Sequence, residues 1–174
     1  KNKEIYNEYL TNIIKDIKEQ ANSHIASQKQ IEKSLSKEEN ELIINTLKKN
    51  VKHSIQNNDD LEDLKQYIIY MIFENNPMRT DISTSKFILI KDKPKMQTDQ
   101  NYIILDKQNK DVIYVQVNYK TKKHYDENEI KLDKDLYKYI AKLYNYYNNK
   151  LKIKNKYFMY EKDNKTPFNE NYLS

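Results

Sequence analysis

The stretch YIILDKQNKDVIYVQV, residues 102–117, decides the fold of this chain. Two runs rich in β-branched and aromatic residues, Tyr102–Leu105 and Val112–Val117, flank six polar residues, Asp106–Asp111. This pattern is typical of two short strands joined by a hairpin turn. The turn has to be built without glycine, because the chain contains none.

Two more short runs are expected to be strands: Phe87–Ile90, which precedes this hairpin in the chain, and Glu129–Leu132, which pairs back after a polar loop. Beyond them the apolar residues recur at spacings of three and four, which is the pattern of amphipathic helices. Helices are expected from Ile5 to Ala21, from Ser36 to Val51, from Asn57 to Asn75 and from Asp133 to Tyr147. The sequence therefore predicts an α+β fold, mainly helical, with a small antiparallel sheet of three or four strands between helices.

Residues 36–174 are expected to form one domain, and residues 1–35 a helical linker or the end of a preceding domain. Ser36 opens the domain as a helix N-cap, with Glu39 in the position of the capping-box partner. The first residue is Lys rather than Met, so we expect the chain to be a piece of a longer polypeptide. From Asn169 onward the sequence indicates the start of another helix.

Composition excludes several classes of site. The absence of glycine rules out glycine-rich phosphate loops, and the absence of cysteine rules out disulfides and thiolate metal sites. Three dispersed histidines, His24, His53 and His124, lack metal-ligand spacing, so we expect no metal and no cofactor. Turns that need a positive φ are expected to be made by Asn or Asp.

Charge and hydropathy narrow the choice of partner. The net charge is +5, which permits a polyanionic partner. No apolar run approaches the roughly 18 residues of a membrane span, and no export signal is present, so we expect no membrane partner. An intracellular protein is expected, with host nucleus, cytoplasm and virion left open as locations. The abundance of Lys, Asn, Ile and Tyr is typical of an AT-rich genome.

The chain has a single arginine, Arg79, among 31 basic residues. Lysine carries the same charge, so charge alone does not explain why arginine stands here. Arginine adds a planar fork of donors that grips a phosphate or a carboxylate through two parallel hydrogen bonds. The alternative is a structural Arg79 that pairs with a buried carboxylate or stacks on a tyrosine.

The order of motifs resembles the catalytic domain of the tyrosine recombinases, the phage-integrase family. Pro77–Ile82 follows a long helix and is similar to the family segment that holds the first catalytic arginine. After the sheet region, Asn118–Lys123 is similar to the hairpin Lys-Thr motif of the family, and a strand follows it. Ser36–Glu39 resembles the usual entry to the catalytic domain. The resemblance covers about residues 36–174.

The resemblance implies catalytic roles for Arg79 and Lys120. Arg79 would hold two oxygens of the scissile phosphate, and Lys120 would protonate the departing 5′-oxygen as general acid. Lys86, Lys122 and Lys123 would contact DNA, and Lys122 or Lys123 could take the place of Lys120. The alternative for Lys120 is an exposed hairpin lysine that keeps a sheet edge soluble. Arg and Lys supply the positive charge, so the implied chemistry needs no metal.

The chain departs from the family pattern at two places. Ile82 stands where an acidic residue often follows the arginine, although Asp81 lies beside it. The later motif, His or Lys with Arg three residues on, and the nucleophilic tyrosine are missing. Tyr172 is a poor candidate for the nucleophile, because it would precede that second arginine. We therefore expect this fragment alone to be inactive.

The function expected from the resemblance is cleavage and rejoining of DNA strands in site-specific recombination or integration. The parent protein would come from a virus, a phage or a mobile element and would act as a homo-oligomer on double-stranded DNA. One alternative is a non-catalytic DNA-binding or virion structural protein with a recombinase-like fold. Another is a structural or interaction domain in which Arg79 is incidental.

Overall fold

The computed structural model describes residues 34–76, 80–117 and 128–168. The chain divides into two compact units, Lys1–Asn40 and Glu41–Ser174. The first described helix, α3 (Lys37–Asn50), begins with the predicted capping box. The Glu39 N–H donates to Ser36 Oγ at 3.1 Å, and the Ser36 N–H donates back to the Glu39 carboxylate at 2.8 Å.

Two helices supply the helical side of the core. Helix α4 (Asn58–Asn75) is capped by Asn57, whose side chain accepts a hydrogen bond of 2.9 Å from the Asp60 N–H. Helix α5 (Tyr137–Asn149) follows the 3₁₀ helix η4 (Lys134–Leu136), which is capped by Asp133. Both helices bury the apolar stripes that their sequence periodicity predicts. The stripes consist of Leu61, Leu64, Ile68 and Ile72 on α4, and of Ile140, Leu143, Tyr144 and Tyr147 on α5.

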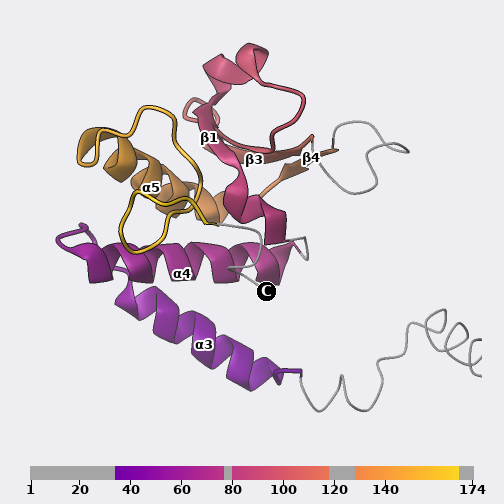
Figure 1. The fold of residues 1–174 in the computed structure, drawn as a ribbon. Helices are drawn as coiled ribbons and strands as arrows, with labels where there is room; N and C mark the ends of the chain where they lie inside the picture. Colours follow the sequence, from indigo (N-terminus) through magenta and orange to yellow (C-terminus); the bar gives the residue numbers. More distant parts are fainter. Residues whose placement is uncertain (1–33, 77–79, 118–127, 169–174) are drawn as a thin grey trace, which may run out of the picture. The chain divides into compact units, whose positions relative to one another are not determined.

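The predicted α+β fold is confirmed, with one correction to the sheet (Figure 1). Four strands lie in the order β1-β2-β3-β4. They are β1 (Lys86–Leu89), β2 (Tyr102–Asp106), β3 (Asp111–Gln116) and β4 (Asn128–Lys131). Strands β2, β3 and β4 are antiparallel, but β1 pairs with β2 in parallel, so the sheet is mixed. The reason is the connection 90–101, which returns the chain to the end of the sheet where β1 began, so that β2 runs in the same direction as β1.

The side chains of the sheet divide between two apolar clusters, as the alternation along a strand requires. The larger cluster joins one face of the sheet to α4 and α5. The smaller cluster covers the other face with residues of the β1–β2 connection, including Ile90 and Met96. Burying a large apolar side chain stabilises the fold by about 1.5–3 kcal/mol. The sheet contributes Phe87, Ile103, Leu105, Val112 and Tyr114 to the larger cluster, and Tyr102, Ile104, Val115 and Val117 to the smaller one.

The turns show how a glycine-free chain reaches positive φ. Lys110 in the β2–β3 hairpin has φ 55°, Lys152 after α5 has φ 53°, and Asn164 has φ 55°. The expectation that Asn or Asp would make these turns is correct for Asn164 and wrong for the two lysines. A left-handed conformation costs a residue with a Cβ about 1–2 kcal/mol. In the hairpin, hydrogen bonds from the Gln108 and Asn109 N–H groups to the Asp106 carboxylate offset part of that cost.

The segment after α5 runs along the outer edge of β1. Residues 150–156 form an irregular linker in which Leu151 and Ile153 are half-buried, Lys150, Lys152 and Lys154 are exposed, and Lys156 is buried. Further on, the Phe87 N–H donates to the Lys156 carbonyl and the Phe158 N–H to the Ser85 carbonyl, both at 2.8 Å. These two bonds make an antiparallel bridge between Lys86 and Tyr157. The C-terminal segment therefore closes the edge of the sheet next to β1.

Candidate functional site

Most of the predicted site residues lie outside the described residues. These are Arg79, Lys120, Lys122 and Lys123. In chain order, Arg79 stands between the end of α4 and the start of the 3₁₀ helix η1 (Thr80–Thr84). The three lysines stand between β3 and β4, which pair as antiparallel neighbours. A hairpin lysine of the predicted kind requires such a pair of strands.

The chain that follows Arg79 is anchored in the core. Ile82 is fully buried in the larger apolar cluster, and the Ser85 N–H donates to its carbonyl at 3.1 Å. A carboxylate at position 82 would be stripped of water among apolar side chains, at a large energetic cost. This burial gives a physical reason for an isoleucine rather than a carboxylate at position 82.

Lys86 is the one predicted DNA-contacting residue that the structure describes. Its Nζ lies 3.4 Å from the centroid of the Tyr157 ring, which is a close cation–π contact. The side chain is half-buried at the start of β1. Within the described ranges no carboxylate lies at ion-pair distance from it. Among the described residues, the contact of the Lys86 ammonium is therefore with an aromatic ring and not with a carboxylate.

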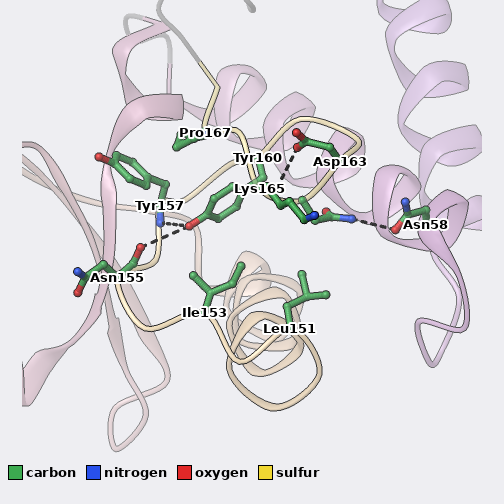
Figure 2. Close-up of a pocket in the computed structure, with 10 residues that line it drawn as sticks. Asn58, Leu151, Ile153, Asn155, Tyr157, Tyr160, Asp163, Lys165 and Pro167 are labelled. Carbon is green, nitrogen blue, oxygen red and sulfur yellow. Dashed lines mark hydrogen bonds between the residues drawn. The ribbon is translucent and has the colours of Figure 1, made fainter.

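A groove of about 690 Å³ is lined in part by Tyr157 (Figure 2). Its lining combines an apolar floor, an aromatic wall and a polar rim. The floor is formed by Leu151 and Ile153, the wall by Tyr157 and Tyr160, and the rim includes Asp163 and Lys165. Tyr157 thus borders both the groove and Lys86.

The aromatic wall is held by hydrogen bonds and ring contacts. The Tyr160 hydroxyl accepts from the Tyr157 N–H at 3.0 Å and donates to the Asn155 carbonyl at 3.4 Å. The Tyr160 ring meets the Tyr147 ring edge to face at 5.2 Å, and burial raises the pKa of both phenols. Both tyrosines therefore stay neutral at physiological pH and act as fixed packing groups.

Polar side chains of α4 form hydrogen bonds with the segment 160–164, which follows Tyr157 in the chain. Asn58, Glu62 and Lys65 follow one another at spacings of four and three, so they share one side of the helix. Lys65 is only 2% exposed and forms an ion pair with Glu62. Its Nζ donates to the Tyr160 carbonyl at 2.7 Å and lies 5.7 Å from the centre of the Phe168 ring. Burial is the largest cause of the lowered pKa of Lys65.

The loop 161–166 is closed by its own side chains. Asp163 accepts hydrogen bonds from the N–H groups of Lys165 and Thr166 at 2.9 Å and from the Thr166 hydroxyl at 2.6 Å. These bonds, that of the hydroxyl foremost, lower the pKa of Asp163 to about 2. Asn58 on α4 accepts from the Asn164 amide at 2.9 Å and donates to the Lys162 carbonyl at 3.1 Å. The polar rim of the groove is therefore ordered by the loop and by α4 together.

Sequence reasoning missed Tyr157 and Lys65 as residues that support the site. A signal for Lys65 was present, because it stands four residues after Leu61 and three before Ile68, on the apolar side of α4. A lysine at such a position needs a buried partner. For Tyr157 no local signal existed, since its partner Lys86 comes from a distant strand.

Comparisons with protein-family models, with curated proteins and with solved structures found no match for this chain. None of the helices in the described ranges combines the length and the apolar character needed to cross a membrane. No three His, Cys, Asp or Glu side chains of those ranges gather as metal ligands. The case for a function therefore rests on this chain's own residues.

Proposed function

We propose that this chain belongs to a protein that cleaves and rejoins DNA strands by the chemistry of the tyrosine recombinases. The observation that carries the proposal is the order of elements around the two key residues. In chain order, helix α4 is followed by the lone Arg79 and then by a small sheet. Lys120 stands between the antiparallel strands β3 and β4, and helix α5 comes after them. The proposed partner is double-stranded DNA, bound by a homo-oligomer.

The chemistry is phosphoryl transfer to a tyrosine. The nucleophilic oxygen attacks the phosphorus, negative charge builds on the non-bridging oxygens, and the 5′-oxygen leaves as the new bond forms. Arg79 would hold two of the charged oxygens in its fork, which a lysine cannot copy. Lys120 would give its proton to the leaving 5′-oxygen, with Lys122 and Lys123 as the alternatives.

The described part of the chain restricts which tyrosine can be the nucleophile. Six tyrosines are at most 9% exposed, so their hydroxyl groups cannot reach a DNA phosphate without unfolding of the core. They are Tyr67, Tyr102, Tyr114, Tyr144, Tyr147 and Tyr160. We assign none of them as the nucleophile.

Duplex DNA binding measured against salt concentration tests the DNA role. Each phosphate neutralised by a Lys or Arg contributes about −0.9 to the slope of log K against log salt. The proposal predicts a steep slope that becomes shallower by about 0.9 in Arg79→Ala, while Arg79→Lys keeps the slope because it keeps the charge. A flat response of the unchanged protein would overturn the proposal.

The special role of arginine is tested by Arg79→Lys in the full parent protein, with strand cleavage as the readout. Loss of one preorganised donor lowers the rate about 10²–10³-fold, and we expect a loss of at least this size with little change in melting temperature. A large fall in melting temperature would instead identify Arg79 as the partner of a buried carboxylate.

A further inference from the structure

We propose that Tyr157 is a positioning residue, which fixes the ammonium group of Lys86 for contact with a DNA phosphate. This inference rests on the proposed function and adds a residue that the sequence did not single out. It also makes the C-terminal segment, where it bridges to β1, a part of the DNA-contacting surface.

The backbone fixes the two residues opposite each other. Hydrogen bonds of 2.8 Å stand on both sides of the pair, from Phe87 to Lys156 and from Phe158 to Ser85. In such an antiparallel pair the two side chains leave the sheet on the same face. The Lys86 Nζ lies 3.4 Å from the centre of the Tyr157 ring as a consequence.

Tyr157 is itself held in place by Tyr160. Its backbone N–H donates to the Tyr160 hydroxyl at 3.0 Å, and the two rings meet edge to face with centres 6.2 Å apart. Tyr160 is only 3% exposed, and its carbonyl is bound by Lys65. A continuous series of contacts therefore connects the core helix α4 to the Lys86 ammonium.

An aromatic partner suits a phosphate-binding lysine better than a carboxylate does. A carboxylate would neutralise the ammonium and compete with phosphate for its donors. The aromatic ring attracts the ammonium through its quadrupole. The ring carries no charge and is not a carboxylate-like acceptor, so the positive charge of the lysine is not cancelled and its N–H donors stay available for a phosphate. Holding the flexible lysine stem before DNA arrives also reduces the entropy lost on binding.

The location of Lys86 in the chain fits this role. The 3₁₀ helix η1, whose Ile82 is buried, separates Arg79 from the start of β1. A short anchored segment therefore joins the lone arginine to the lysine that Tyr157 holds. In chain order, Lys86 therefore follows closely after the residue that the proposed function assigns to the scissile phosphate.

The test is a double-mutant cycle on duplex binding, measured between about 50 mM and 200 mM salt, where phosphate contacts change affinity strongly. Lys86→Gln should weaken binding and make the salt slope shallower by about 0.9. Tyr157→Leu should weaken binding about two- to five-fold, the loss expected for an exposed cation–π contact. Tyr157→Phe keeps the aromatic face and should bind as the unchanged protein does.

The double variant Lys86→Gln/Tyr157→Leu distinguishes positioning from general support of the fold. If Tyr157 acts through Lys86, the double variant binds as Lys86→Gln alone. An equal loss from Tyr157→Leu in both backgrounds, or no loss in either, would overturn the inference while duplex binding by the unchanged protein still supports the DNA role. No duplex binding by the unchanged protein would overturn both.

A second measurement covers the case in which Tyr157→Leu does not fold. In the unchanged protein, the aromatic ring current should shift the methylene protons next to the Lys86 ammonium upfield in the NMR spectrum. Addition of duplex DNA should move the same signals. Ordinary lysine shifts for these protons would overturn the inference.

Discussion

The ammonium group of Lys65 donates a 2.7 Å hydrogen bond to the backbone carbonyl of Tyr160, inside the protein. The same ammonium pairs with Glu62, one turn earlier on α4. The buried ammonium of Lys65 thus links helix α4 to Tyr160, the residue that contacts Tyr157. A buried lysine is tolerated when nearby acceptors compensate its charge, and the Glu62 carboxylate and the Tyr160 carbonyl supply two of them.

Lys65→Met tests whether this link supports the fold. The substitution leaves the Glu62 carboxylate and the Tyr160 carbonyl without their partner, and we expect the free energy of unfolding in urea to fall by about 2–4 kcal/mol. The exposed Lys134→Met serves as the control and should change stability by less than about 0.5 kcal/mol. The double variant Glu62→Leu/Lys65→Met should recover part of the loss. Equal effects of Lys65→Met and Lys134→Met would contradict this account.

The lowered pKa of Lys65 predicts a pH dependence of stability. Below the ordinary lysine pKa of 10.5 the unfolded chain binds a proton at Lys65 more tightly than the folded one does. The contribution of Lys65 to stability therefore rises as the pH increases toward that value. The difference in unfolding free energy between the unchanged protein and Lys65→Met should grow from about pH 8 to about pH 10. A difference that shrinks over this interval would show a raised pKa instead.

Asp163 predicts a loss of stability in acid. Its folded pKa of about 2 lies below the ordinary aspartate pKa of 3.8, so its contribution to stability is complete above the unfolded pKa and is lost as the pH falls toward 2. Thermal unfolding of Asp163→Asn should depend less on pH over this interval than that of the unchanged protein. Identical pH profiles of the two proteins would show that the Thr166 and Lys165 hydrogen bonds add nothing to stability.

Two neighbouring tyrosines should respond in opposite ways to loss of the hydroxyl group. The Tyr147 hydroxyl is buried without a hydrogen-bond partner among the described residues, so Tyr147→Phe should leave stability unchanged or raise it by up to about 1 kcal/mol. Tyr160→Phe removes the hydrogen bonds to Tyr157 and Asn155 and should lower stability by about 1–2 kcal/mol. Urea unfolding of both variants checks the contrast. A fall in both would indicate a partner for Tyr147 outside those residues.

Local pattern was enough to predict most of the elements. A few neighbouring residues are enough to specify each of three features: the capping box at Ser36, the Asn57 cap, and the alternation of apolar residues along the strands. The parallel pairing of β1 with β2 was not accessible in this way. It depends on the path of residues 90–101 across the second face of the sheet, which no short-range signal specifies.

The supporting contacts of the candidate site were harder to predict than the fold. Lys86 was expected to contact DNA, but its partner Tyr157 comes from the far end of the described chain. Such pairs follow from the packing of complete elements, so a single sequence does not reveal them. Lys65 was readable in principle from its place on the apolar side of α4, although nothing local identifies Tyr160 as its acceptor.

The most direct test of the central claim asks whether positions 79 and 120 lie next to each other. Since the chain has no cysteine, Arg79→Cys and Lys120→Cys provide unique sites for a pair of spin labels. Two groups that act on one phosphate must both come within hydrogen-bonding reach of it, about 3 Å from its oxygens. The account predicts strong dipolar broadening in the doubly labelled protein, with each single label as control and with folding checked by circular dichroism. Labels too far apart to broaden each other in the folded protein would contradict it.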